Sequence, residues 1–199
     1  AAYRRITSDS VVTINKVERK TVFQQAPLLY DLTALQKDCN IHHDLSADKT
    51  LSIAQSLYEK KLVSYPRTGS RYIPEDIMAN IPALLEKIIA MPLFREYGRT
   101  FDFSALNTRS VDTTKVTDHH AIIPTVEIAR TDLSELPSGE RDVLTLLAVR
   151  LLCATTQVHR FEAVTAILDC QGYTFTAKGK TILQSGWKEV ERIHRMSIR

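Results

Sequence analysis

The sequence predicts an α+β fold in which a helical domain is inserted into a β domain whose two halves lie at opposite ends of the chain. Residues 10–25 and 161–179 are rich in β-branched residues and partly alternate between apolar and polar side chains, which predicts strands. Residues 27–62 and 140–156 carry apolar side chains in patterns suited to helices. Residues 101–125 are polar and threonine-rich without a period, which predicts a long ordered loop.

The first β segment, residues 10–25, has a charged break at residues 18–20. It is therefore predicted as two strands or as one bent ribbon. Pro27 then suits the first turn of a helix, and leucines at helical spacing continue that helix through about Cys39.

A loop is expected at residues 40–44. Ser46 is the expected N-cap of a second helix over residues 47–61, whose apolar side chains share one face. Two helices joined by a short polar connection resemble a helix-turn-helix. Residues 62–67 then read as a short extended stretch.

Three prolines punctuate the following segment. Because an interior proline removes a backbone donor and clashes with the preceding turn, Pro74, Pro82 and Pro92 are expected to divide residues 73–97 into short helices.

The last part of the chain returns to β structure. A turn at residues 137–139 precedes a helix over about residues 140–156. Residues 161–169 and 173–179 then alternate around a turn that contains Gly172, which is the pattern of a hairpin.

The composition is that of an ordinary globular protein, with 44% apolar and 25% charged residues in 199. A net charge of +3 permits binding to nucleic acid without requiring it. The longest apolar stretch, residues 144–154, is interrupted by Arg150 and falls short of the roughly 18 residues that a membrane span needs, so no such span is expected.

The three cysteines, Cys39, Cys153 and Cys170, share no CxxC-type spacing. Neither a disulfide framework nor a zinc site is therefore indicated, and a cytoplasmic location, in a reducing cytosol, fits best. The chain opens without an initiator Met directly before a strand-like run, and it reads as a piece of a longer protein.

Residues 64–70 read SYPRTGS and carry the first candidate chemistry. Pro66 favours an extended Tyr65, which places Tyr65 and Arg67 on the same side of the chain. A phenol with a reference pKa of about 10 attacks phosphorus only with positive charge nearby, and a guanidinium supplies that charge and fits phosphate. A purely structural interpretation also stands, in which Tyr65 is a half-buried strand residue and Arg67 is a solvated cation.

Hydroxyl groups flank the tyrosine at Ser64, Thr68 and Ser70, and they suit contacts to phosphate oxygens. Residues 118–125 read DHHAIIPT and end the long loop. A histidine there could bind a phosphate or relay a proton, and since neighbouring residues of a strand point to opposite sides, one of His119 and His120 is expected to do so. The alternative is an ordinary surface histidine. Neither this pair nor the pair at residues 42–43 has a third ligand at sensible spacing, so no metal site is indicated.

The combination and order of the motifs resemble a known family. SYPRT followed by HHAIIPT, with PLLYDLTALQKD and QSLYEKKL before them, resembles the active-site region of type IA DNA topoisomerases of the topoisomerase III kind. The resemblance covers nearly the whole chain and is weakest in residues 1–20 and 96–117.

The resemblance implies a role for each matching residue. Tyr65 would attack a phosphodiester of single-stranded DNA and form a 5′-phosphotyrosyl link, and Arg67 would sit on the scissile phosphate. His119 would contact DNA near the cleavage point. Further DNA contacts are expected at Ser64, Thr68, Ser70, His120 and Thr125.

Two departures from the family follow from the sequence. Gly69 stands where the family usually has an acidic residue. The magnesium-binding acidic residues of the family lie in an N-terminal Toprim domain, and this sequence has no D-x-D motif. We therefore expect Mg²⁺ to bind outside this chain, and this chain alone to be inactive.

The resemblance also implies a domain plan: a winged-helix-like helical domain with the tyrosine, inserted into a β-rich arch of a gated ring. Residues 1–26 and 161–199 are predicted to form the arch. Residues 27–126 would form the tyrosine domain, and residues 127–160 a helical segment of a neighbouring domain. Trp187 is expected to pack as part of the hairpin region.

The expected partners are single-stranded DNA and the protein's own Toprim domain, with no membrane, in a monomer of the bacterial cytosol or nucleoid. The alternative is a non-catalytic helix-turn-helix or single-strand binder in which Tyr65 stacks on a base. A tyrosine recombinase would place its tyrosine late, after the histidine, whereas Tyr65 precedes His119.

Overall fold

The computed structural model describes residues 6–7, 10–99 and 101–197 of the chain. The chain folds into two compact units. The strand unit comprises residues 1–25 and 158–185, and the helical unit comprises residues 26–157 and 186–199. The chain thus passes from strand to helices and back to strands, which confirms the predicted α+β class.

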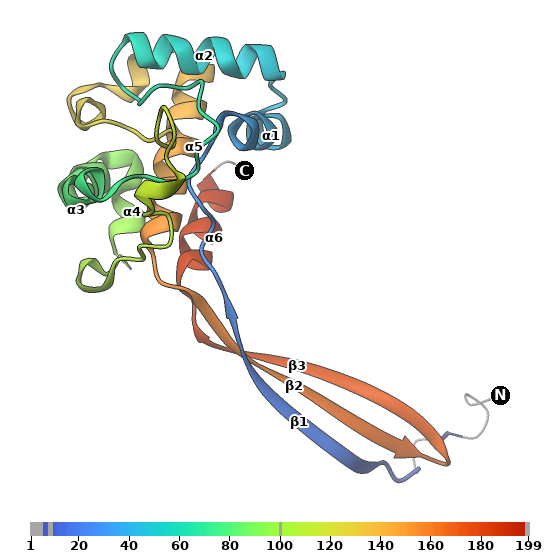
Figure 1. Cartoon of the computed structure of the whole chain (residues 1–199). Helices are drawn as coiled ribbons and strands as arrows, with labels where there is room; N and C mark the ends of the chain where they lie inside the picture. Colours follow the sequence, from blue (N-terminus) through green and yellow to red (C-terminus); the bar gives the residue numbers. More distant parts are fainter. Residues whose placement is uncertain (1–5, 8–9, 100, 198–199) are drawn as a thin grey trace. The chain divides into compact units, whose positions relative to one another are not determined.

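The strand unit is one antiparallel sheet in the order β1-β2-β3 (Figure 1). Its strands are β1 (Thr13–Gln24), β2 (His159–Cys170) and β3 (Tyr173–Gln184). The β2–β3 hairpin was predicted, and its two turn residues, Gln171 and Gly172, both have positive φ, as a two-residue turn of this twist requires. β1 is a single strand rather than two, but residues 18–20 pair with β2 without interruption, so the break predicted there is absent; a register shift lies instead between Ile14 and Lys16.

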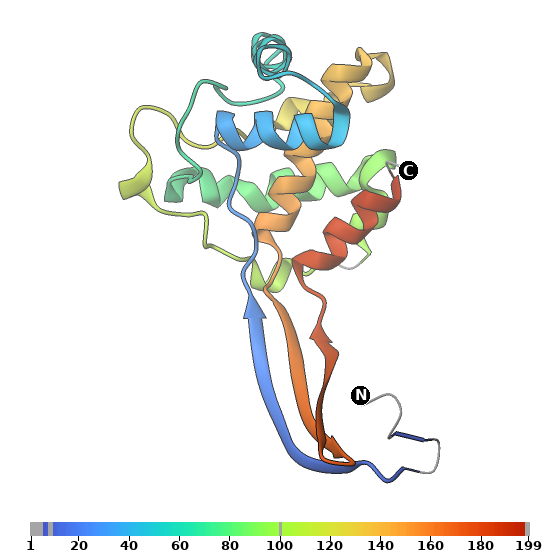
Figure 2. The ribbon, with the colours of Figure 1, turned by 90° about the vertical axis from the view of Figure 1, so that its right-hand side faces the viewer.

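The helical unit is built around α5 (Ser138–Thr155), which packs against three other helices (Figures 1 and 2). Those partners are α1 (Leu32–His43), α2 (Ala47–Glu59) and α6 (Trp187–Ser197). The unit also contains α3 (Glu75–Ala90) and α4 (Arg95–Gly98). Most residues of α5 are buried, and Leu144, Leu147 and Leu151 are at most 1% exposed. This helix is therefore the centre of the core.

Short 3₁₀ turns connect the helices of this unit, at Pro92–Phe94, Phe103–Ala105, Thr113–Lys115, Val126–Arg130 and Leu133–Glu135. Apart from these turns, residues 101–125 form the long ordered loop that the sequence predicts. In the described part of the helical unit, β pairing is confined to isolated bridges: Tyr30 with Ile122, Val63 with Pro124, and Ile73 with Val111.

The first helix differs from its prediction at both ends. α1 begins at Leu32, not near Pro27, because residues 26–30 are held in extended form by distant partners, including the bridge to Ile122. The Asp31 side chain caps the helix by accepting a hydrogen bond from the Ala34 N–H at 2.6 Å. At the other end α1 continues through the expected loop to His43.

The second helix begins where it was predicted and ends at Glu59, two residues before the predicted end. The Ser46 hydroxyl accepts a hydrogen bond from the Lys49 N–H at 3.2 Å, and α2 starts at Ala47. Asp44, with φ 52°, turns the chain between α1 and α2. α2 lies along the page in Figure 1 while α1 is seen nearly end-on, and Figure 2 reverses this, so the two helices cross as in the predicted helix-turn-helix.

One proline prediction is wrong. Pro74 does precede α3 and Pro92 does follow it, but Pro82 lies inside α3 without ending it. An interior proline costs about 3 kcal/mol. Burial of Leu85 and Ile88 on the same helix, both fully inaccessible, offsets that cost, since each buried aliphatic side chain contributes about 1.5–3 kcal/mol.

The division into units differs from the predicted domain boundaries in two places. Residues 127–157 belong to the helical unit rather than to a neighbouring domain, because α5 supplies its core. Residues 187–197 form α6, which was expected to belong to the arch. Trp187 does pack, as expected, but at the start of α6 and in the helical core, where it is 7% exposed.

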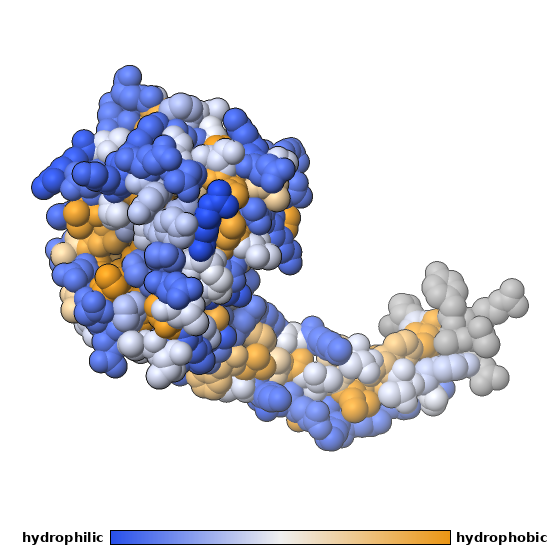
Figure 3. Space-filling model, turned by 45° about the horizontal axis from the view of Figure 1, so that its top comes forward, coloured by the Kyte–Doolittle hydropathy of each residue, from blue (hydrophilic) through white to orange (hydrophobic). Residues whose placement is uncertain are grey.

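The surface mixes polar and apolar side chains (Figure 3). Large apolar residues remain exposed in both units, among them Phe23 in β1 and Leu93 after α3. No single helix among the described residues is long and apolar enough to cross a membrane, and one bent pair, Glu75–Ala90 with Pro92–Gly98, would qualify by length and composition alone.

Candidate active site

Two segments meet in the helical unit: the tyrosine loop, residues 64–70, and the histidine segment, residues 119–125. Pro124 forms a β-bridge with Val63, which directly precedes the tyrosine loop. The Ser64 N–H donates to the Ile123 carbonyl at 2.9 Å. These backbone contacts bring together two motifs that are far apart in the sequence.

The Tyr65 ring lies against the His119 imidazole. Their ring centroids are 4.3 Å apart and their planes are tilted by 43°. Tyr65 is half-buried, whereas His119 and Arg67 are exposed. The three residues that the sequence predicts as catalytic therefore come from two neighbouring segments, and each can be reached from solvent.

Two hydroxyl groups fasten the tyrosine loop to the histidine segment. The Ser64 hydroxyl donates to the Ala121 carbonyl and accepts from the Ile123 N–H, both at 3.0 Å. The Thr68 hydroxyl donates to the His119 carbonyl at 2.8 Å and accepts from the Ser70 N–H at 3.0 Å. Ser64 and Thr68 stand on either side of Tyr65 and Arg67, so both ends of the reactive stretch are fixed.

The remaining predicted DNA contacts also have backbone partners. The Ser70 hydroxyl donates to the Lys115 carbonyl at 3.0 Å, and the Thr125 hydroxyl donates to the Lys61 carbonyl at 2.5 Å. His120 Nδ1 lies 2.7 Å from the Ala121 carbonyl. A hydroxyl has one proton to donate. In this arrangement these groups hold the loops in place, and direct contact with DNA stays a prediction for each of them.

Tyr58 is a residue of the site that sequence reasoning missed. The apolar pattern of α2 assigned it to the buried face, but it is 40% exposed, and its ring lies edge-on to Tyr65 with centroids 5.4 Å apart. A surface groove of about 490 Å³ begins there, lined by Tyr58, Glu59, Lys61, Val63, Ser64 and Thr125. The only sequence signal for this role is an aromatic residue at the end of the amphipathic helix.

Lys115, whose carbonyl accepts from the Ser70 hydroxyl, carries an ion pair next to the tyrosine loop. Lys115 pairs with Asp112 at 2.8 Å, and its ammonium group lies 4.7 Å from the centre of the Tyr72 ring. The hydrogen bond to Asp112 raises the pKa of Lys115.

Gly69 is exposed, and a Cβ atom added there would meet nothing within 4 Å. The backbone thus has room for the acidic side chain that this position lacks.

The site has no set of side chains suited to a metal ion. In the described part of the chain, no three His, Cys, Asp or Glu residues gather closely enough to hold one.

Comparison with known proteins identifies the family to which this chain belongs. The family model for DNA topoisomerase matches residues 1–198. The chain belongs to the type IA DNA topoisomerases. Among curated relatives, this topoisomerase chain is 40% identical to DNA topoisomerase 3 of Bacillus subtilis over 183 residues, covering 90% of the chain and 24% of the relative.

Two further known proteins are similar to this chain. DNA topoisomerase 3 of Bacillus licheniformis is 40% identical over 182 residues, with 90% of this chain and 24% of the relative covered. The solved structure of full-length topoisomerase I from Thermotoga maritima matches with a TM-score of 0.70 at 19% identity, covering 96% of this chain and 31% of that one. That likeness shows the fold. The topoisomerase chain spans about a quarter of the length of its curated relatives.

Proposed function

We propose that Tyr65 is the nucleophile with which the full-length topoisomerase cleaves single-stranded DNA. The observation that carries this proposal is the contact of the Tyr65 ring with His119, with Arg67 two residues along the loop. In the reaction, the phenolic oxygen bonds to phosphorus and the bond from phosphorus to the 3′ oxygen breaks. The phenolic proton is lost and the 3′ oxygen gains one, leaving a 5′-phosphotyrosyl link. The reverse step restores the strand.

Arg67 supplies positive charge to that phosphate, and Arg67 and His119 both supply hydrogen bonds to it. A guanidinium offers a rigid set of N–H donors and stays charged as negative charge grows on the phosphoryl oxygens. His119, in contact with the attacking ring, is close enough to bind the same phosphate or its neighbour. Passage of a second strand through the break before resealing would relax or decatenate DNA.

The reaction depends on parts of the protein outside this chain. A Toprim domain would bring Mg²⁺ and the acidic residues that bind it. The protein would act as a monomer in the bacterial cytosol. This chain by itself would then be inactive, although it holds the nucleophile.

A covalent trapping assay tests the proposal. The full-length protein is mixed with magnesium and a single-stranded DNA labelled at its 3′ end, because a 5′ link keeps the 3′ fragment on the protein. Denaturing electrophoresis should show a labelled protein band that disappears in Tyr65→Phe. No band with the unaltered protein, while DNA binding is intact, would reject the proposal.

The same assay separates cleavage from the binding-module alternative. Tyr65→Phe keeps the aromatic ring and loses the hydroxyl, so base stacking survives and covalent chemistry does not. Unchanged affinity together with loss of the adduct supports the enzyme. An unchanged affinity with no adduct in either form supports a binding module.

A further inference from the structure

The stretch from residue 26 to residue 32, the first residue of α1, is here called the linker, and it lies directly beside both parts of the active site. The Leu32 N–H donates to the Thr68 carbonyl at 3.1 Å, which joins the linker to the tyrosine loop. The Ile122 N–H donates to the Tyr30 carbonyl at 2.8 Å, which joins it to the histidine segment. The linker is therefore a common support for both segments.

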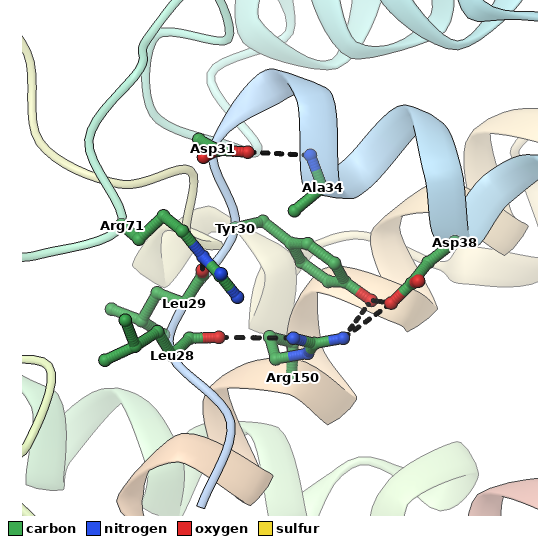
Figure 4. Close-up of polar contacts among 8 residues, drawn as sticks. All are labelled: Leu28, Leu29, Tyr30, Asp31, Ala34, Asp38, Arg71 and Arg150. Atoms are coloured by element: carbon green, nitrogen blue, oxygen red, sulfur yellow. Dashed lines mark hydrogen bonds and ion pairs between the residues drawn. The ribbon is translucent and has the colours of Figure 1, made fainter.

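Three arginines from different parts of the helical unit hold this linker by its backbone carbonyls. Arg71 Nε donates to the Leu29 carbonyl at 3.0 Å, and Arg150 donates to the Leu28 carbonyl at 3.2 Å (Figure 4). Arg109 donates to the Ala26 carbonyl at 2.5 Å. We call these three side chains the arginine clamp.

Arg150 is the most highly connected member of the clamp. From α5 its guanidinium also donates to the Tyr30 hydroxyl at 2.9 Å and pairs with Asp38 at 2.5 Å (Figure 4). It lies over the Tyr30 ring, 4.0 Å from the centroid. Tyr30 in turn donates to Asp38 at 2.7 Å. Arg150 and Asp38 are only 18% and 23% exposed, so solvent screens their attraction weakly.

The placement of these bonds has a consequence for the reactive groups. Thr68 follows Tyr65 by three residues, and Ile122 follows His119 by three residues, and both are bonded to the linker. A shift of the linker would therefore move one loop relative to the other and alter the distance from the phenol to the phosphate-binding groups. Small misplacements of this kind slow reactions strongly, because catalysis depends on near-attack geometry.

We propose that the arginine clamp positions Tyr65 against His119 through the linker, so that Arg150 is a positioning residue for DNA cleavage although it lies away from the phosphate. This inference rests on the proposed function. It assigns a role in the reaction to the Arg150, Tyr30 and Asp38 group, which would otherwise serve only to stabilise the fold.

The test measures cleavage and binding separately in the full-length protein. Arg150→Gln removes the charge and most donors, and Tyr30→Phe removes only the hydroxyl between Arg150 and Asp38. Single-turnover formation of the covalent adduct is timed, and affinity for a fluorescent oligonucleotide is measured without magnesium. We expect adduct formation to slow by about tenfold or more in Arg150→Gln and by less in Tyr30→Phe, with affinity unchanged.

A matched control separates positioning from simple loss of stability. Ile193→Val shortens a buried aliphatic side chain of α6, a helix outside the clamp, and should lower the melting temperature without slowing cleavage at a temperature where all variants are folded. The inference is overturned if Arg150→Gln and Tyr30→Phe both form adduct as fast as this control, or if affinity falls in step with the rate. If Arg150→Gln does not fold, the rate of adduct formation by Tyr30→Phe decides whether the inference stands. Absence of adduct in the unaltered protein would overturn the proposed function itself.

Discussion

The Tyr65 ring and the His119 imidazole lie 4.3 Å apart at their centroids, although 53 other residues separate them in the chain. The contact is not held by the rings themselves. It follows from the hydroxyls of Ser64 and Thr68, which bond to backbone groups of the histidine segment on both sides of the tyrosine. The backbone around the two rings thus imposes the contact between the proposed nucleophile and the proposed phosphate-binding group.

Replacing His119 should separate ring contact from hydrogen bonding. His119→Phe keeps an aromatic surface against Tyr65 but has no N–H donor, and His119→Ala loses both. If the imidazole binds phosphate, both variants should cleave DNA at least about tenfold more slowly, since loss of one donor to a transition state costs that much or more. Single-turnover cleavage rates measure this. Full activity in His119→Phe would show that only the ring matters.

Removing the Thr68 hydroxyl should cost stability without weakening DNA binding. Thr68→Val keeps the shape and leaves the His119 carbonyl and the Ser70 N–H without their partner, at a position that is only 6% exposed. We expect a loss of about 1–3 kcal/mol in the free energy of unfolding. Urea denaturation and oligonucleotide affinity are the two measurements. A fall in affinity at unchanged stability would instead make Thr68 a direct DNA contact.

Stability should fall in mild acid because of a buried histidine on α6. Burial, together with the nearby His42 and His43, lowers the pKa of His194 to about 4, although Glu191 opposes the shift. Tyr97 also faces His194, with its hydroxyl 3.5 Å from Nδ1. The neutral form is favoured in the fold, so its contribution is complete above a pH of about 6.5 and is lost as the pH falls from there towards 4.

Acidification should therefore lower the free energy of unfolding by roughly 1–3 kcal/mol through this one group. Denaturant unfolding at a series of pH values measures the loss, with His194→Gln beside the unaltered protein. The variant should show a flatter profile across the same pH range. Parallel profiles would show that other groups cause the acid sensitivity.

Gly69 should tolerate an acidic side chain. Since a Cβ atom there meets nothing within 4 Å, Gly69→Asp is expected to change the free energy of unfolding by no more than about 0.5 kcal/mol. Thermal melting measures this. A large drop in melting temperature would show that Gly69 is required by the backbone, and not merely a departure from the usual residue of the family.

Local signals predicted the parts of the fold that depend on local chemistry. Ser46 caps α2 because its hydroxyl reaches the Lys49 N–H, and the turn at Gln171 and Gly172 closes a hairpin because both residues accept positive φ. The start of α1 could not be predicted in this way. Residues 26–30 stay extended because their backbone groups bond to Ile122 and to arginines far along the chain, and no local pattern reports such partners.

The candidate site likewise depends on contacts between distant segments, which local sequence patterns do not show. Tyr65, Arg67 and His119 were predicted as site residues through the family resemblance of their motifs. The structure brings Tyr65 and His119 into contact. That the hydroxyls of Ser64 and Thr68 are bonded to backbone carbonyls follows only from the three-dimensional pairing of the two loops. The role of Arg150 is likewise invisible in the sequence, where it merely interrupts an apolar run.

The most direct test of the central claim is to identify the residue that carries DNA. The full-length protein is trapped on single-stranded DNA, treated with nuclease to leave a short nucleotide tag, and digested with trypsin. Cleavage after Lys61 and Arg67 releases the peptide Leu62–Arg67, which contains both Ser64 and Tyr65. Fragment ions in mass spectrometry should place the 5′-linked nucleotide on Tyr65. A tag on Ser64 or on any other peptide would contradict the account.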